Sequence, residues 1–171
     1  MNVGTKINGR LYNDVYQALK SACKHPADQT CGANMKGKFG VFVPKDDIIA
    51  KEEMYVTVDS ARWNGNKAIY NLLIGAVAGA AERGTWYPGN CHAFKSKDGG
   101  GYTFCSTVSR VAVSFPGDSY MNVTFRSSSA QDGFDCWKIR ETAAVYLEGL
   151  KREIEDAVGG DYFYVDDACV D

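Results

Sequence analysis

Six cysteines are distributed along the chain of 171 residues, and no two of them have the C-x-x-C spacing. That spacing is typical of zinc knuckles and of thiol redox motifs, so its absence from the sequence argues against both roles. An even number of cysteines in a short chain predicts disulfides, which persist in oxidising compartments. We therefore expect a secreted protein, and buried thiols in a cytosolic protein are the alternative. The cysteines are Cys23, Cys31, Cys91, Cys105, Cys136 and Cys169.

One disulfide follows from the geometry of a predicted hairpin. Cys91 and Cys105 flank the turn-rich run at residues 97–101. A hairpin centred on this run places the two cysteines opposite each other, which brings their Cβ atoms within bridging range. By proximity and elimination, the remaining pairs are expected to be Cys23–Cys31 and Cys136–Cys169.

Composition limits the class of protein. The chain is 45% hydrophobic and 23% charged, and it is long enough to bury a core as one domain over residues 1–171. The apolar stretch at residues 68–81 is too short to span a bilayer, so we expect no membrane insertion. A net charge of −2 and scattered basic residues give no reason to expect a nucleic-acid partner. Residues 1–6 contain no apolar signal region, as in a mature secreted chain with an added methionine, and equally in a cytosolic protein.

The hydrophobic pattern predicts both helices and strands. Apolar residues at steps of three and four predict a helix over residues 9–23 and a long amphipathic helix over residues 136–158. A third helix, at residues 67–83, contains Gly75 and Gly79, which predict close packing against another backbone. Strands are expected at residues 39–43, 54–58, 91–94, 102–105, 108–115, 120–126 and 162–165.

These elements predict an α+β fold. Hairpins, rather than single βα units, favour a mainly antiparallel β-sheet with the two long helices packed on one face, an N-terminal helix and stabilising disulfides. Residues 39–95 and 102–169 each follow the order strand, strand, helix, strand. We expect a pseudo-repeat of topology there, without a strict sequence repeat.

Few residues are candidates for catalysis. His25 lies in a predicted loop, and His92 lies beside Cys91 on a predicted strand. Consecutive strand residues point to opposite faces, so Cys91 and His92 are poorly placed to act as nucleophile and base. A secreted ribonuclease would combine His92 with a glutamate and with Arg110 or Arg126 as a phosphate clamp, and this is the enzymatic alternative.

Motifs typical of enzymes and cofactor-binding proteins are missing from the sequence. It contains no G-x-S-x-G, Walker loop, G-x-G-x-x-G or H-E-x-x-H. The adjacent carboxylates at residues 46–47, 52–53 and 166–167 lack the separation of a hydrolase pair, so we expect them to be solvated. We therefore expect a protein that is not an enzyme and that holds no cofactor or metal.

The beginning of the long amphipathic helix resembles a known family. Trp137, Lys138, Ile139 and Arg140 are similar to the Trp-basic-apolar-basic motif of the LARS family, the avirulence-suppressing effectors of plant-pathogenic fungi. Lys138 stands where that family usually has arginine. Members of the family are antiparallel sheets with helices, held together by disulfides. The resemblance implies a secreted, non-enzymatic virulence effector or avirulence protein that binds an unidentified host protein.

The same resemblance implies a place of action and a site. The effector would modulate plant immunity, or be sensed by it, either outside the plant cell or after translocation into it. Trp137, Lys138 and Arg140 are the expected partner-binding residues. The alternative is that these side chains only anchor the helix to the sheet.

A second resemblance is to fungal killer toxins, which are disulfide-bonded sheets with a pair of helices on one face. It implies an antifungal protein that acts on target cells, often at membranes, with residues 67–83 as the element of interest. The functional hypotheses are thus an effector, a toxin-like protein and a secreted ribonuclease, each expected to be a monomer.

Overall fold

The computed structural model describes residues 2–5, 10–127, 149, 152–153, 156 and 164–166. Among these residues, the elements with defined bounds are two helices, one short 3₁₀ helix and nine strands, and residues 149, 152, 153 and 156 are also helical. The helices are α1 (Arg10–Ala22), α2 (Lys67–Gly84) and the 3₁₀ helix η1 (Pro88–Asn90). The strands are β1 (Asn2–Thr5), β2 (Thr30–Cys31), β3 (Met35–Lys45), β4 (Ile48–Arg62), β5 (Cys91–Lys95), β6 (Gly101–Ser106), β7 (Arg110–Phe115), β8 (Ser119–Ser127) and β9 (Tyr164–Asp166).

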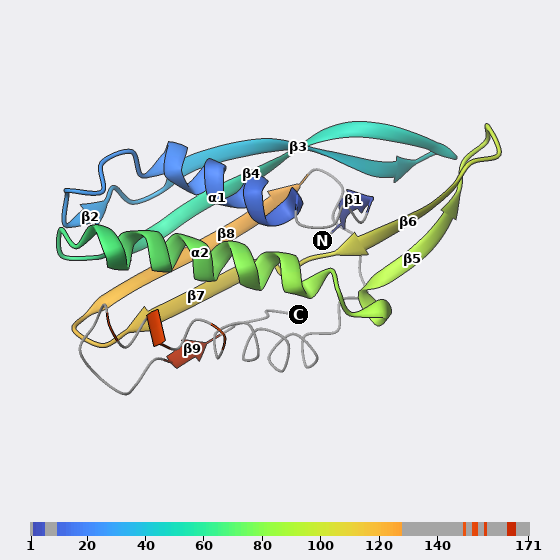
Figure 1. Ribbon diagram of the computed structural model, residues 1–171. Helices are drawn as coiled ribbons and strands as arrows, with labels where there is room; N and C mark the ends of the chain where they lie inside the picture. The colour runs from blue at the N-terminus through green and yellow to red at the C-terminus, as the bar shows by residue number, and fades with distance from the viewer. Residues whose placement is uncertain are drawn as a thin grey trace.

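The strands form two antiparallel sheets. In the six-stranded main sheet the order is β2-β4-β8-β7-β9, and β3 also pairs with β4. The small sheet has three strands in the order β1-β6-β5. Helices α1 and α2 lie side by side on one face of the main sheet (Figure 1). The prediction of an α+β fold with mainly antiparallel sheets, helices and disulfides is confirmed.

Two hairpins extend together beyond the ends of the helices (Figure 1). We call the outer parts of these hairpins, residues 40–53 and 94–102, the arm. The β3–β4 hairpin closes with Asp46 and Asp47 at φ 48° and 64°, the left-handed backbone that a two-residue type I′ turn requires. The N–H of Lys97 in the β5–β6 turn donates to the carbonyl of Asp47 at 2.9 Å. The tips of the two hairpins are therefore joined.

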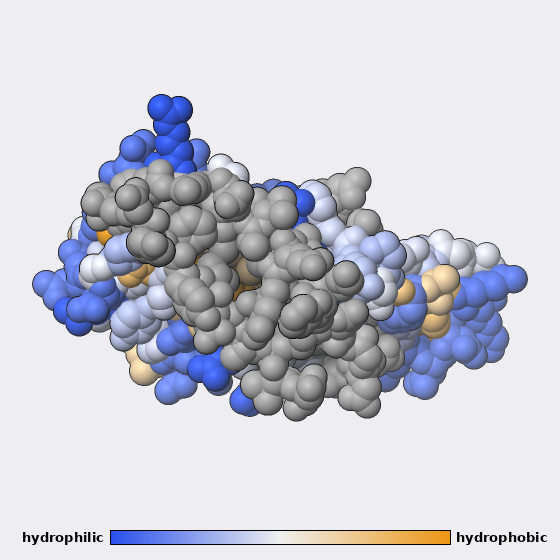
Figure 2. Space-filling view, turned by 90° about the horizontal axis from the view of Figure 1, so that it is seen from below, coloured by the Kyte–Doolittle hydropathy of each residue, from blue (hydrophilic) through white to orange (hydrophobic). Residues whose placement is uncertain are grey.

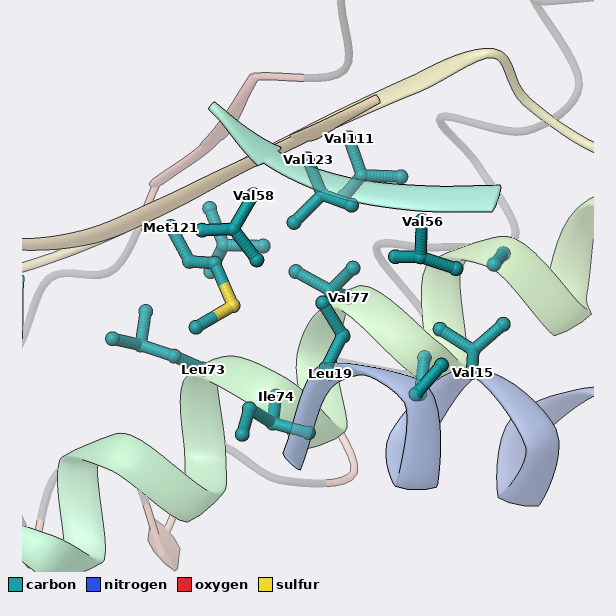
Figure 3. Close-up of a cluster of buried hydrophobic side chains, with 14 of the residues drawn as sticks. Val15, Leu19, Val56, Val58, Leu73, Ile74, Val77, Val111, Met121 and Val123 are labelled. Atoms are coloured by element: carbon teal, nitrogen blue, oxygen red, sulfur yellow. The ribbon is translucent and has the colours of Figure 1, made fainter. Parts of the chain in front are cut away.

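The core lies between α1, α2 and the inner face of the main sheet (Figure 3). Alternate residues of β3, β4, β7 and β8 point into it, as expected for a sheet with one covered face. Each fully buried aliphatic side chain contributes about 1.5–3 kcal/mol relative to exposure. The side chains with no exposed surface include Val15, Leu19, Val56, Val58, Leu73, Ile74, Val77, Val111, Met121 and Val123.

Small residues let the helices approach their neighbours closely. A Cβ atom on Gly75 of α2 would lie 3.1 Å from the Tyr12 hydroxyl of α1. At Gly75 the helix therefore packs against another helix, but the nearby atom belongs to a side chain and not to the backbone that was expected. Gly79 is also buried. On β3, a Cβ atom on Gly37 would come within 2.6 Å of the Ala18 carbonyl carbon in α1.

Both disulfides that fall among the described residues are the predicted ones. Cys23 is bonded to Cys31, and Cys91 is bonded to Cys105, its direct partner across the β5–β6 pair. The predicted Cys136–Cys169 pair lies outside the described residues.

Two aromatic side chains secure the loop that Cys23–Cys31 closes. The Tyr70 hydroxyl donates to the Cys23 carbonyl at 2.6 Å, and the indole N–H of Trp63 donates to the Pro26 carbonyl at 3.0 Å. The rings of Trp63 and Tyr70 meet edge to face, with 5.0 Å between centroids. The loop is therefore fixed to α2 and to the end of β4.

Several predicted elements differ in extent. The strands expected at residues 39–43 and 54–58, with a charged loop between them, are parts of longer strands that leave only a two-residue turn. Strands β1 and β2 were not predicted. Three helices were predicted, two long ones and an N-terminal one. The described elements include only two, the N-terminal helix α1 and the long helix α2, so this part of the prediction is not matched in full. The helix expected over residues 136–158 lies mostly outside the described residues. Within that range only residues 149, 152, 153 and 156 are described, and these four are helical.

The single domain and the pseudo-repeat over residues 39–95 and 102–169 stay predictions. The strands on which the repeat was based nevertheless lie side by side in the main sheet, where Val56 pairs with Phe125 and Val58 pairs with Val123.

Candidate interaction surface

The predicted partner-binding residues Trp137, Lys138 and Arg140 lie outside the described residues. The histidines are both described, and both are exposed. His92 stacks on Phe104, with 6.2 Å between ring centroids, and belongs to the small sheet. Arg110 and Arg126, its proposed partners in a ribonuclease, belong to the main sheet.

Two features are absent from the described part of the chain. It contains no cluster of three or more histidine, cysteine or carboxylate side chains that would hold a metal ion. None of the helices among the described residues has the length and apolarity needed to cross a membrane.

The face of the main sheet opposite the helices carries polar side chains in a regular arrangement. In β4 the side chains of Val56 and Val58 point to the helices, so Tyr55 and Thr57 point the other way. A shift of register near Asp59 keeps Ala61 in the core. We call this side of strands β3, β4, β8 and β7 the outward face.

Two rows of side chains cross the outward face from β3 to β8 or β7. Each row consists of residues that lie directly opposite one another on neighbouring strands. Each row contains two cations, and all four are exposed. We call them the basic rows. The first is Lys38, Tyr55 and Arg126, and the second is Lys36, Thr57, Thr124 and Arg110.

One ion pair stands at the edge of the basic rows. The Lys38 ammonium lies 2.7 Å from Oε1 of Glu53, and the Tyr55 hydroxyl donates to Oε2 of the same carboxylate at 2.9 Å. These hydrogen bonds, first that of Lys38 and then that of Tyr55, lower the pKa of Glu53. The hydrogen bond with Glu53 likewise raises the pKa values of Lys38 and Tyr55. Glu53 therefore remains ionised and fixes the Tyr55 hydroxyl.

Between the long basic side chains, the outward face carries short polar side chains on β4 and β8. The Thr124 hydroxyl donates to Oδ2 of Asp59 at 2.7 Å, and the Asn122 amide donates to the Ser60 hydroxyl at 2.9 Å. These contacts cross from β8 to β4, so they hold the two central strands in register. The result is a flat polar surface from which the long basic side chains and Tyr55 project.

A smaller exposed feature lies after α2. Trp86 is 44% exposed, and the guanidinium of Arg83 lies 3.8 Å from the centre of its ring. Such a cation–π contact covers one side of the indole and leaves the rest accessible.

The arm carries a depression in the surface. It is shallow and open, and Phe94, Tyr102 and Thr103 are among its lining residues. Figure 2 shows the arm at one end of the molecule, mostly hydrophilic with a small apolar patch. A surface of this kind offers little enclosed volume for a small molecule.

Sequence reasoning did not identify the outward face. The sequence does contain the residues of this face: Lys36 and Lys38 alternate on one strand, and Arg110 and Arg126 lie singly on two others. Only the pairing of the strands brings these four residues together. Comparison with known proteins adds no assignment: no family model, no curated protein and no solved structure matches the chain.

Proposed function

We propose that the protein is a secreted, extracellular effector that acts by binding, in the manner of the LARS effectors of plant-pathogenic fungi. The observation that carries the proposal is the combination of two disulfides with an exposed, polar and aromatic sheet face. Disulfides maintain a fold in oxidising surroundings, where they are not reduced. An exposed flat face with cations and a tyrosine is suited to recognition, because such side chains dominate binding energies at interfaces.

The motif at Trp137, Lys138 and Arg140 is the second part of the proposal. We propose that residues 136–158 form the second long helix, which begins with this motif. The helical conformation at residues 149, 152, 153 and 156 supports that proposal. A tryptophan beside two cations at the beginning of a helix combines an apolar ring with charges that would meet acidic groups on a host protein.

The test is a plant response to purified protein. The wild type, the double variant Trp137→Ala/Arg140→Ala and the control Lys24→Gln/Lys67→Gln would be infiltrated into leaves of plants that respond to the pathogen. We expect the wild type and the control to change the immune response, and the Trp137/Arg140 variant to lose most of that effect while keeping the wild-type circular dichroism. A wild-type protein without any plant response contradicts the effector role. A folded Trp137/Arg140 variant as active as wild type contradicts the assignment of the motif.

One observation favours a toxin-like protein as the second candidate. Helices α1 and α2 lie side by side on one face of an antiparallel sheet, as the resemblance to killer toxins implies. A toxin would inhibit the growth of sensitive fungal cells in a dose-dependent manner, whereas an effector would leave them unharmed. In the same samples, RNA degradation that is lost in His92→Ala would instead favour the ribonuclease hypothesis.

A further inference from the structure

The basic rows concentrate positive charge that the sequence distributes over three strands. Lys36 and Lys38 lie on β3, Arg126 on β8 and Arg110 on β7. Neighbouring strands are about 4.8 Å apart, so the row from Lys36 to Arg110 covers about 14 Å. Four cations therefore surround a patch only a few side chains wide.

The carboxylates on the same face neutralise only part of this charge. Glu53 is bound by Lys38 and Tyr55, and Asp59 accepts a hydrogen bond from Thr124. Among the residues that the structure describes, Lys36, Arg110 and Arg126 form no ion pair. Because these cations are exposed and form no ion pair with a described residue, the patch attracts anions, and that attraction depends on ionic strength.

Tyr55 gives the patch a second chemical property. Its side chain is 42% exposed in the middle of the first basic row, between Lys38 and Arg126. Its hydroxyl is held by Glu53, which restricts the ring. An aromatic ring on a flat sheet stacks on a nucleobase, while lysine and arginine beside it contact phosphates. A polymer that alternates phosphates with flat bases matches both properties of the patch.

We propose that the basic rows bind single-stranded RNA, with phosphates on Lys36, Arg110 and Arg126 and a base stacked on Tyr55. The proposal deepens the proposed function, because it names a partner class for the outward face of a binding protein. It opposes the expectation drawn from net charge, which averages over the whole surface and does not register a local patch. With three to four phosphates contacted, tripling the salt concentration is expected to weaken binding about 10- to 20-fold.

The experiment is a fluorescence anisotropy titration of a labelled ten-nucleotide uridine RNA at low salt and at three times that salt concentration. The charge variant is Arg110→Gln/Arg126→Gln, and the stacking variant is Tyr55→Ala. The matched control is Lys24→Gln/Lys67→Gln, which removes the same charge from exposed positions away from the outward face. Circular dichroism confirms that each variant is folded.

We expect the charge variant to weaken RNA binding at least about tenfold, the stacking variant to weaken it several-fold, and the control to bind like wild type. The proposal is wrong if wild type does not bind the RNA at low salt, or if the control loses as much affinity as the charge variant. It is also wrong if heparin or phosphatidylserine vesicles bind more tightly than RNA and Tyr55→Ala changes nothing, since the face would then recognise charge alone. RNA binding is measured on purified protein and the effector role on leaves, so either can fail without the other.

Discussion

The backbone N–H of Tyr12 donates a hydrogen bond of 2.7 Å to Oε2 of Glu82, from the first turn of α1 to the last part of α2. The first N–H groups of a helix have no partner within it, so they need an acceptor from elsewhere. A carboxylate at that end also interacts favourably with the helix dipole. Glu82, although buried, therefore joins the two helices by capping one of them.

Removing this cap is expected to destabilise the fold. Glu82→Ala should lower the free energy of unfolding by about 1–2 kcal/mol, because the N–H of Tyr12 loses its acceptor. Glu82→Gln keeps an acceptor oxygen without the charge and should lose less. Urea denaturation followed by circular dichroism measures both. Asp28→Ala, which removes an exposed carboxylate, is the control, and an equal loss in the control and in Glu82→Ala would contradict the capping role.

Gly37 is expected to tolerate no side chain. A methyl group there would overlap the Ala18 carbonyl of α1, so the helix would have to move away from the sheet. We expect Gly37→Ala to cost about 1–3 kcal/mol of unfolding free energy, as overpacked sites do. Gly40→Ala on the same strand meets only the end of the flexible Lys51 side chain and should be nearly neutral. Equal stabilities of the two variants would show that α1 does not contact β3 this closely.

Local patterns predicted the parts of the fold that depend on neighbouring residues. The stripe of Val15 and Leu19 on α1 and the hairpin that pairs Cys91 with Cys105 both arise from short-range geometry, and both are confirmed. The helix expected from residue 67 begins there as α2, and the Asn66 side chain caps it by accepting from the N–H groups of Ala68 and Ile69. Periodicity and turn residues carry this information without knowledge of distant contacts.

The arm and the outward face required long-range pairing. The end of the β3–β4 hairpin, residues 44–53, is rich in charge and contains no buried residue, so its sequence resembles a loop, although an unbroken ladder from Met35 to Lys45 holds it in paired strands. The basic rows combine residues up to 90 positions apart, from Lys36 to Arg126. Register between strands is a tertiary property, and alternation within one strand does not determine it.

The Glu53 carboxylate should titrate below its ordinary range. Hydrogen bonds from Lys38 and then Tyr55 lower its pKa in the folded state, so its contribution to stability is present at neutral pH and is lost as the pH falls through that lowered pKa. Carbon-detected NMR titration of the side-chain carboxyl measures the pKa directly. In Lys38→Met the pKa of Glu53 should rise toward the ordinary value, and the thermal stability should lose part of its dependence on acid pH.

Lys36→Met is the control for this titration, since Lys36 is exposed on the same strand and forms no ion pair with a described residue. It should leave the pKa of Glu53 nearly unchanged. A Glu53 pKa in the ordinary range in the wild type would contradict the ion pair with Lys38.

The disulfide between Cys91 and Cys105 closes a loop with a sequence separation of 14 residues at the base of the β5–β6 hairpin. In the loop-entropy account, its removal in Cys91→Ser/Cys105→Ser should lower the free energy of unfolding by about 3 kcal/mol. Denaturant unfolding measures this loss, and the reduced wild type should lose at least as much. Peptide mapping under non-reducing conditions should recover Cys91 linked to Cys105 and Cys23 linked to Cys31. Linkage of any of these four cysteines to a different partner would contradict the pairing. Alkylation of all of them without reductant would contradict the oxidising compartment as well.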